Sequence, residues 1–445
     1  MQHRLFAALS SGPKKGRELL QSLNVSQPTL SRLTNHARRA GRIGVLGGGR
    51  STRYALLRSN RGLAPEQPVY RISAMGAPQR VGSVLTLEPT RLWFAHHGLP
   101  GSGTEFDALP WFMSDLRPSG FIGSQLAPLW PDLGLPPRAE DWTTDQALLA
   151  MVRRGEDAPG DLLIGEESLA RWLALEARPT LSATTMIAPA QRLHRYAECV
   201  AELLAGRCAG AWVGGEQPKF TALVGGDATT ARHVIVKFSG LRTNAAGKRW
   251  ANLLLAEHVA TEVLREQGHS AAVTAFFQNE RRAYLEIQRF DRVGPRGRQG
   301  AVSLRALRAG LCCETRSTLD CAAALLRAQR ITSEDARELR WRAAFGALIG
   351  NALLQSDDVS FISSARGTLR LAPIYDMLPM IYAPLGDDLP MREFGPPTPA
   401  PAYADQWRAA IPAAASFWQR LGQDVRATLD MRVLARENAA RLLAL

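Results

Sequence analysis

Apolar residues along the first sixty positions follow two different periods in turn. In GRELLQSLNV and SQPTLSRLTNHARRAG they recur every three or four positions, which predicts two short amphipathic helices joined by a tight turn, with Ser26 as the N-cap of the second. In RIGVLGGGRSTRYALLR they alternate with polar residues, which predicts a β-hairpin with Gly47 to Gly49 at its tip. Residues 1–60 are therefore expected to form a helix, a turn, a second helix and a hairpin.

The rest of the chain switches between strand-like and helix-like patterns. A linker rich in Pro, Gly and Asn is expected near residues 59–68, and alternating strands are expected in residues 69–96. Residues 126–200 have a mainly helical pattern. Further on, RHVIVKFSG predicts a strand, WANLLLAEHVATEVL predicts a helix, and LRLAPIYDML predicts a strand followed by a turn. The mixture of these patterns predicts a multidomain α+β protein.

The composition is that of a chain able to bury sizeable cores. Of 445 residues, 46% are hydrophobic and 21% are charged, which predicts a globular protein of about two to four domains. No apolar run approaches the roughly 18 residues that a membrane helix requires, and the first residues lack a signal-peptide core, so a cytoplasmic location is expected. The five cysteines show no paired CxxC spacing, which favours free thiols over disulfides or zinc.

Positive charge is concentrated at the N-terminus. Residues 1–60 contain eleven Lys and Arg against one acid, a net charge of +10 out of +13 for the chain. This concentration predicts a polyanion-binding surface, and a helix-turn-helix followed by a basic hairpin, or wing, favours duplex DNA. A solvated basic face or an RNA-contacting arm is the alternative. The side chains expected to contact DNA are Ser26, Gln27, Thr29, Arg32, Arg38, Arg50 and Arg53.

Two acids in the last quarter of the chain suggest metal chemistry. Asp358 and Asp376 lie eighteen positions apart and flank a predicted hairpin, which can direct both carboxylates at one Mg²⁺ ion. Upstream, Lys237 lies in an alternating strand and Glu257 lies on the following predicted helix. This is the order of the lysine and glutamate pair in the small lobe of protein kinases. The four residues together predict a phosphotransfer site that uses ATP and Mg²⁺.

Further candidates for nucleotide contacts lie on either side of the lysine. Gly215, which follows Gly214, lets backbone N–H groups approach a phosphate closely, although glycine pairs are also common in ordinary hairpins. Gln288 and Phe290 end an apolar strand in the manner of a hinge whose backbone contacts adenine. The alternative reading of this segment is simply the end of a buried strand.

Several of these motifs together resemble a known family. GGEQPKFTALVGG, HVIVKFSG, EIQRFDRVG and the segment from Gly350 to Asp376 resemble the HipA-type serine/threonine kinases of toxin–antitoxin systems, and the order agrees over about residues 68–445. The additional basic N-terminal segment fits a YjjJ-like branch best. The resemblance implies that Gln217 and Lys219 belong to the nucleotide site, that the substrate is a protein and that an antitoxin partner exists. The fused basic segment offers a replacement for that partner.

The resemblance also implies a division into domains. A winged helix-turn-helix is expected at residues 1–60, a small α/β subdomain like the HipA N-terminal region at 68–189, a kinase small lobe at 190–292 and a helical large lobe at 293–445.

The expected catalytic loop departs from the family pattern. In the family, a GN or GA pair is followed by TDxHxxN, whose Asp is the catalytic base and whose Asn binds Mg²⁺; here the pattern places Leu353 at the base and Asp358 at the Asn. Leucine cannot accept a proton, and Asp357 replaces the base only if the loop shifts in register. Two hypotheses follow. In one, the protein is an active kinase with Asp357, Lys237 and Glu257 as catalytic residues. In the other, it is an inactive pseudokinase that regulates transcription through its DNA-binding segment.

Overall fold

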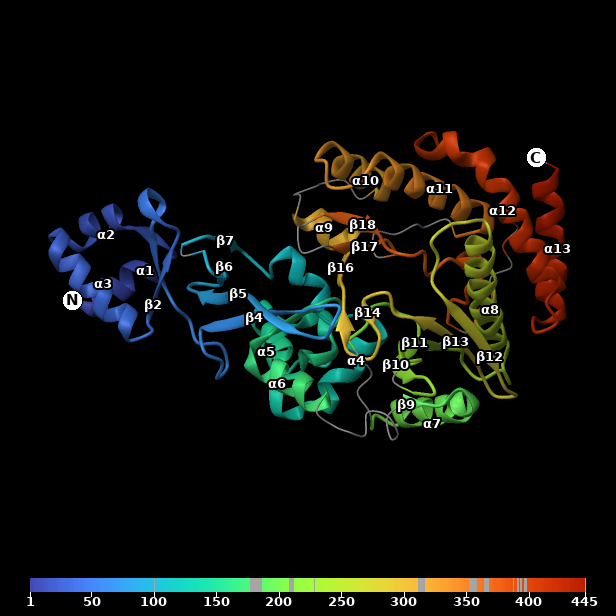
Figure 1. Ribbon diagram of the computed structural model, residues 1–445, viewed down its shortest axis with the longest axis horizontal. Coiled ribbons are helices and arrows are strands. Elements are labelled where there is room, and N and C mark those ends of the chain that lie inside the picture. The colour runs from blue at the N-terminus through green and yellow to red at the C-terminus, as the bar shows by residue number, and fades with distance from the viewer. Residues whose placement is uncertain are drawn as a thin grey trace.

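The chain forms an elongated series of units, with the N-terminus at one end and the C-terminal helices at the other (Figure 1). In this computed structural model the described residues are 1–99, 101–176, 186–207, 212–227, 229–310, 317–351, 358–363, 368–386, 388–389, 392, 394–395 and 398–444.

The N-terminal unit contains the expected helices and hairpin together with a further helix at its start. Its elements are α1 (Gln2–Leu9), β1 (Lys14–Lys15), α2 (Gly16–Leu23), α3 (Gln27–Arg39), β2 (Ile43–Leu46) and β3 (Arg53–Leu56). The antiparallel sheet has the strand order β1-β3-β2. Leu5, Leu19 and Leu30, one from each helix, are buried against Ile43. Asn24 ends α2 in a left-handed conformation, which turns the chain into α3.

The segment expected to be a linker is packed between the N-terminal and middle units. The guanidinium of Arg58 donates to both carboxylate oxygens of Asp145, and the Asn60 Nδ2 donates to the Asp145 carbonyl at 2.9 Å. Leu63 is buried in the core of the middle unit. The Pro, Gly and Asn residues of the 59–68 segment correctly predict turns. A segment made of turns can still form buried hydrogen bonds, as this one does. The segment at 59–68 is therefore a fixed joint.

The middle unit is a sheet with helices packed on it. Its strands and main helices are β4 (Glu66–Ile72), β5 (Pro78–Leu87), β6 (Arg91–His96), β7 (Gly103–Phe106), β8 (Leu162–Ile164), the 3-10 helices η2 (Trp111–Leu116) and η5 (Gly155–Asp157), α4 (Gly120–Leu129), α5 (Thr144–Arg154) and α6 (Gly165–Glu176). The strand order is β7-β6-β5-β4-β8, with antiparallel pairing throughout. Val69, Val84 and Phe94 point to one face of the sheet and pack against Leu148 of α5.

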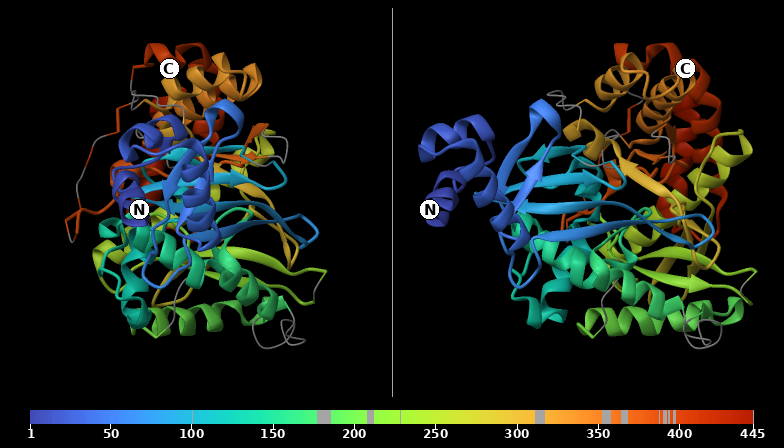
Figure 2. Two further views of the ribbon diagram at one scale, coloured as in Figure 1. Left: turned by 90° about the vertical axis from the view of Figure 1, so that its left-hand side faces the viewer. Right: turned by 60° about the vertical axis from the view of Figure 1, so that its left-hand side comes forward.

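The small lobe is a sheet placed between two helices. Its elements are β9 (Met186–Ile187), α7 (Arg192–Leu204), β10 (Lys219–Val224), β11 (Arg232–Phe238), α8 (Ala245–Glu266), β12 (Thr274–Gln278) and β13 (Ala283–Gln288), with the strand order β12-β13-β11-β10-β9. Helix α7 lies along one face of this sheet (Figure 2). Val234 and Val236 belong to the core that faces α7, whereas Leu285 and Ile287 belong to the core that faces α8. Because side chains alternate along a strand, Lys237 points to the same side as α8.

The large lobe combines a small sheet with a group of helices. Its elements are β14 (Arg292–Val293), β15 (Gly297–Arg298), β16 (Gly300–Ser303), α9 (Leu304–Gly310), α10 (Thr318–Arg327), α11 (Ser333–Ile349), β17 (Ser360–Ser363), β18 (Leu369–Leu371), α12 (Ala404–Gln423) and α13 (Leu429–Leu443). Strands β16, β17 and β18 are adjacent in that order, and α8 of the small lobe shares one buried core with α11, α12 and α13. Within the described part of the chain, none of the helices combines the length and the apolar character needed to span a membrane.

A buried cluster of arginine and aspartate side chains joins the middle unit to the end of β13. Asp291 accepts hydrogen bonds from Arg289 Nε and Nη2, each at 2.9 Å, and from Arg292 Nη1 at 2.7 Å. Both arginines also reach Asp157 in η5, at 3.1 and 2.9 Å, and the Gly160 N–H donates to Asp291 at 2.9 Å. Burial acts to raise the pKa of Asp291, but the two guanidinium groups outweigh burial and hold the pKa below its usual range.

Replacing Asp291 by Asn is expected to destabilise the fold, because two buried guanidinium groups lose one of the two carboxylates that compensate their charge. Breaking a buried ion pair typically costs about 3–5 kcal/mol. The measurement is the free energy of unfolding in urea at neutral pH. As a control, Glu266→Gln removes an ion pair with Arg420 in which both side chains are about half exposed, at 55% and 43%, and the expected loss is below about 1 kcal/mol. Equal losses in the two variants would contradict the role of the cluster.

Candidate functional site

Lys237 lies at the centre of a charged cluster between the two lobes. Its Nζ donates to both carboxylate oxygens of Glu257 in α8, at 2.8 Å each. Asp376, in the segment after β18, contacts the same ammonium, and its backbone N–H donates to Glu257 Oε1 at 3.2 Å. Asp376 has a φ of +56°, and the Asn351 amide donates to its carbonyl at 3.0 Å. The structure thus brings together three residues that the sequence places up to 139 positions apart.

The electrostatics of this cluster maintain a positive charge. Lys237 is 5% exposed and Glu257 is 1% exposed. Burial acts to lower the pKa of Lys237, but the carboxylates of Asp376 and Glu257 outweigh it and raise the pKa above its usual value. Burial also acts to raise the pKa of Asp376, yet Lys237 and Lys219 hold it below the usual range. Lys237 is therefore an ammonium at neutral pH.

Lys219 and two glycines form one edge of the site. The Lys219 Nζ donates to the Gly214 carbonyl at 2.6 Å, and burial lowers the pKa of Lys219 to about 8 against the opposing effect of Asp376. Gly215 has a φ of +99°, and a Cβ atom there would lie 2.6 Å from the Lys219 Nζ. The positive φ favours glycine at this position.

The predicted hinge lies at the end of β13. The Gln288 N–H donates to the Val273 carbonyl at 2.9 Å, and the Arg289 N–H donates to the His233 carbonyl at 2.9 Å. Among the described residues, the Phe290 N–H has no backbone acceptor. The Phe290 ring stacks on Tyr375, with 5.9 Å between ring centroids.

These groups surround a cavity of about 240 Å³. Of the residues predicted to bind the nucleotide or the metal, those that line it are Gly215, Lys219, Lys237, Gln288, Phe290, Asp358 and Asp376. Glu257 lies behind Lys237, and Gln217 is half-buried beside the cavity without lining it. Asp358 and Asp376 therefore face one space, as the hairpin prediction requires. The structure does not describe residues 352–357, so Leu353 and Asp357 lie outside its range.

Five charged residues of the cavity wall carry no prediction from the sequence: Arg289 and Asp291 of the buried ion cluster, and three from other elements. Asp115 and Arg117 come from the middle unit, and Arg305 comes from α9. Asp115 accepts hydrogen bonds from the Ser303 N–H and hydroxyl, both at 2.7 Å. No motif marks these three residues, because their proximity to Lys237 arises only when the middle unit packs against the large lobe.

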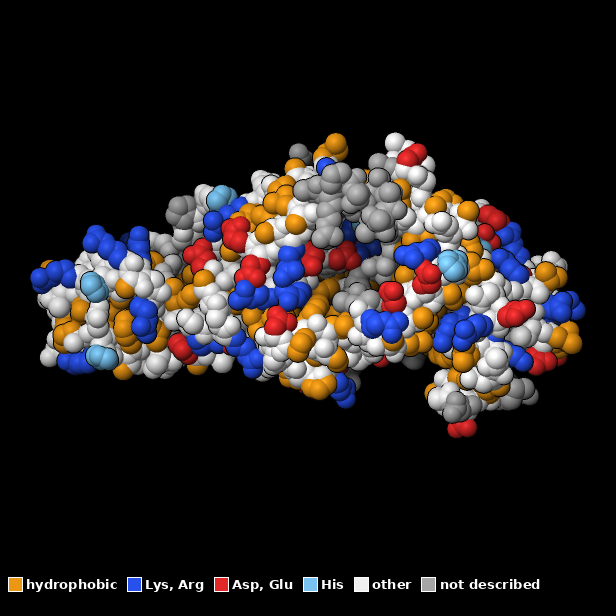
Figure 3. All heavy atoms as spheres, turned by 90° about the horizontal axis from the view of Figure 1, so that it is seen from below, with side chains coloured by type: hydrophobic (Ala, Val, Ile, Leu, Met, Phe, Trp, Pro, Cys, Tyr) orange, Lys and Arg blue, Asp and Glu red, His pale blue; other side chains and the backbone are white. Residues whose placement is uncertain are grey.

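Most of the predicted DNA contacts lie on the exposed surface of the N-terminal unit. Lys and Arg side chains gather on this unit at the left of Figure 3. Ser26 has the expected N-cap position of α3, but its hydroxyl bonds to the Thr29 hydroxyl at 3.0 Å and makes no capping bond. The other side chains on the exposed surface are Gln27, Arg32, Arg38 and Arg50.

Arg53 differs from the other predicted DNA contacts. Its guanidinium pairs with Glu105 of β7 at 2.6 Å and lies over the Trp93 ring, with 5.8 Å to the ring centroid. This places Arg53 at the joint with the middle unit. Its expected role as a DNA contact stays a prediction, although Glu105 already pairs with its charge within the protein.

Comparisons with known proteins agree with this architecture. Residues 63–173 match the family described as "YjjJ-like toxin, middle domain", and residues 211–431 match "HipA-like C-terminal domain". The chain is 34% identical over 433 residues to Toxin YjjJ of Escherichia coli strain K12, covering 96% of this chain and 95% of that protein. This chain belongs to the HipA family of toxins, in its YjjJ-like branch.

Two solved structures are more distant from this YjjJ-like chain. One is a complex of HipA, HipB and operator DNA from Shewanella oneidensis MR-1, at 15% identity and a TM-score of 0.49, covering 82% of this chain and 94% of that one. The other is the Helicobacter pylori proinflammatory kinase CtkA, at 11% identity and a TM-score of 0.36, covering 51% of this chain and 90% of that one. With both scores below 0.5, neither likeness defines the activity of this YjjJ-like chain.

Proposed function

We propose that this HipA-family toxin binds ATP with Mg²⁺ in the cavity between the lobes and transfers the γ-phosphoryl group to a serine or threonine of a protein. The observation that carries the proposal is the convergence of Lys237, Glu257 and Asp376 at the wall of this cavity. Lys237 would donate to phosphate oxygens, while Glu257 holds its ammonium in place. Lys219 adds a second ammonium on the same side of the cavity.

The cavity also fits a hard divalent cation. Among the described residues, no group of three or more His, Cys, Asp or Glu side chains is arranged to hold a metal. Mg²⁺, however, is usually held by one or two carboxylates together with phosphate oxygens and water. Asp358 and Asp376 supply those carboxylates, and when bound the cation would neutralise charge on the phosphates.

The proton acceptor is the open part of this proposal. General-base assistance is worth about 10²–10⁴-fold in rate, or about 3–5 kcal/mol of barrier. The family pattern places Leu353 at the base, whereas a shifted register would place Asp357 there. A second candidate function follows from Leu353. In it, the protein binds nucleotide without transferring phosphate and acts as a DNA-binding regulator.

We propose that the N-terminal unit is a winged helix-turn-helix that binds duplex DNA through α3 and the β2–β3 hairpin. The sheet order β1-β3-β2 behind α2 and α3 supports this, as does a net charge of +10 in residues 1–60. A separate antitoxin partner otherwise brings such a toxin to DNA. Because the N-terminal unit is part of the same chain, it would take over that role here.

Nucleotide binding is expected to stabilise the protein. ATP with Mg²⁺ at a hundred times its Kd should add about 2.7 kcal/mol to the free energy of unfolding, which thermal-shift titration detects as a rise in Tm. Asp376→Ala should abolish most of the gain, because it removes a metal ligand. Asp405→Ala, which removes a half-exposed carboxylate on α12, is the control and should retain it. The absence of any shift in the wild type at millimolar ATP would exclude the nucleotide site.

Phosphotransfer separates the two hypotheses about the base. If the family register holds, the wild type has little activity, and Leu353→Asp should raise the transfer of labelled γ-phosphate to itself or to lysate proteins by up to about 10²–10⁴-fold. Leu353→Asn, which cannot accept a proton in the same way, is the matched control. Robust wild-type activity that is lost in Asp357→Asn and indifferent to residue 353 would establish the shifted register instead.

DNA binding should depend strongly on salt. If the N-terminal unit contacts about five phosphates, log K should fall with log salt at a slope of about −4 to −5, measured by fluorescence anisotropy of labelled duplex with the full chain. Arg32→Ala should weaken binding to all sequences. Gln27→Ala should mainly reduce discrimination among sequences, because an amide at a helix start can read an adenine edge.

The control for these two variants is Arg265→Ala, on the exposed side of α8. It should leave both the slope and the affinity unchanged. Duplex binding without a salt slope, or a preference for single-stranded RNA, would contradict the DNA proposal.

A further inference from the structure

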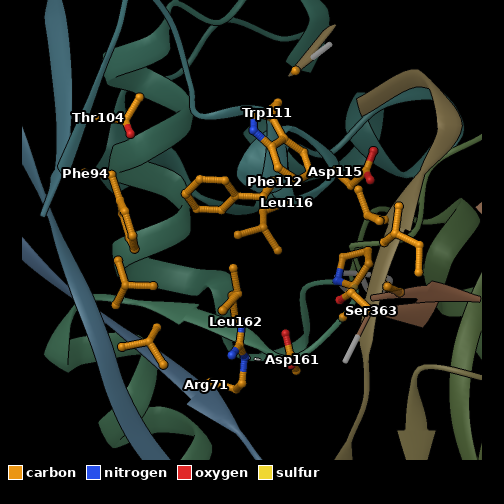
Figure 4. Close-up of a pocket in the computed structure, with 18 of the residues that line it drawn as sticks. Arg71, Phe94, Thr104, Trp111, Phe112, Asp115, Leu116, Asp161, Leu162 and Ser363 are labelled. Atoms are coloured by element: carbon orange, nitrogen blue, oxygen red, sulfur yellow. Dashed lines mark ion pairs between the residues drawn. The ribbon is translucent and has the colours of Figure 1, made fainter. Parts of the chain in front are cut away.

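A second cavity, of about 620 Å³, lies between the middle unit and the β16–β18 sheet (Figure 4). Its volume falls within the range of about 300–1,000 Å³ typical of small-molecule sites. The residues that it shares with the smaller cavity described above are Asp115, Pro159, Ala301 and Val302. Lys237 and Asp376 line only the smaller cavity. The larger cavity is therefore a separate space, adjacent to the proposed nucleotide site and away from the phosphate-binding lysine.

Aromatic side chains form one side of this cavity. Phe112 of η2 makes edge-to-face contacts with Phe94 and Phe106, at centroid distances of 5.0 and 6.2 Å, and with Trp111 at 5.5 Å. Figure 4 shows Phe94 and Phe112 pointing into the space, with Leu116 between them and Leu162. The backbone of Gly310 lies close against the Trp111 ring. A Cβ atom on Gly310 would be 2.5 Å from that ring. Such a wall suits a flat aromatic ring, which stacks or packs edge to face.

The polar groups of the cavity leave unused donors. The Arg71 Nε of β4 pairs with the Asp161 Oδ2 at 3.1 Å, while its two Nη groups make no hydrogen bond within the described part of the chain. Arg330 lines the cavity from the other side, its side chain is exposed, and it has no ion pair among the described residues. The Asp115 carboxylate, in contrast, is already bonded to Ser303. The cavity therefore offers guanidinium donors, which favour an anionic group.

We propose that this cavity is a binding site for a small planar aromatic anion. The ring would lie against Phe94 and Phe112, and its carboxylate, sulfonate or phosphate group would face Arg71 and Arg330. The site goes beyond the proposed phosphotransfer function and does not depend on it. A ligand here would share a wall with the nucleotide but would lie away from the lysine that contacts the phosphates.

The test uses 8-anilinonaphthalene-1-sulfonate, a fluorescent aromatic anion, titrated into the full chain. We expect saturable binding with one site per chain. Thr104→Trp places an indole in the cavity from an exposed position on β7 and should weaken binding at least about tenfold by occupying the space. Arg330→Gln should weaken it by about tenfold through loss of a charge-assisted hydrogen bond. Arg265→Gln, an exposed arginine outside both cavities, is the matched control and should bind as the wild type does.

Competition with ATP and Mg²⁺ identifies the cavity that the probe occupies. Complete displacement by ATP together with unchanged binding in Thr104→Trp would place the probe in the smaller cavity and overturn the proposal. Absence of saturable binding to the wild type would also overturn it. If Thr104→Trp lowers the Tm below that of the wild type, Ser363→Trp is tested in its place, because it fills the same cavity from β17. If ATP gives no thermal shift but the probe still binds and its binding is still weakened in Thr104→Trp and Arg330→Gln, only the nucleotide proposal is refuted.

Discussion

The buried ion cluster at the end of β13 is the constraint on which the packing of the middle unit against the lobes depends. Arg289 and Arg292 each bridge Asp291, next to the hinge, and Asp157, in the middle unit. Charges buried to this extent tolerate little displacement, because any separation leaves them uncompensated in a medium of low dielectric constant. The cluster therefore fixes Phe290, which lies between two of its members, and with it one wall of the smaller cavity.

Local chemistry could be predicted from the sequence wherever it depends on a local pattern. The β-branched alternation around Lys237 gives the strand that points its ammonium toward α8, and the apolar helix around Glu257 gives the partner carboxylate. The hairpin in residues 43–56 follows from alternation around glycines. In each case the spacing of the apolar side chains determines which face of the element is buried. The buried face then determines which element packs against it.

Long-range packing could not be predicted in the same way. Asp115 and Arg117 carry no motif, and they line the smaller cavity only through the packing of the middle unit. Arg53 reads as a wing-tip cation, because nothing in the local sequence reveals Glu105 as its partner. Contacts of this kind form where two units meet, and the sequence of one segment does not show which residues of another unit will lie opposite it.

The joint between the N-terminal and middle units has a geometric consequence. Arg53, Arg58 and Asn60 bond the N-terminal unit to the middle unit, which restricts rotation of one unit against the other. If α3 binds a DNA duplex, the rest of each molecule would then lie at a fixed angle around the axis of that duplex. Two molecules on neighbouring half-sites would face each other only when the spacing is close to a whole number of turns, about 10–10.5 base pairs each. An additional half turn of DNA between the two half-sites would place the two molecules on opposite sides of the duplex.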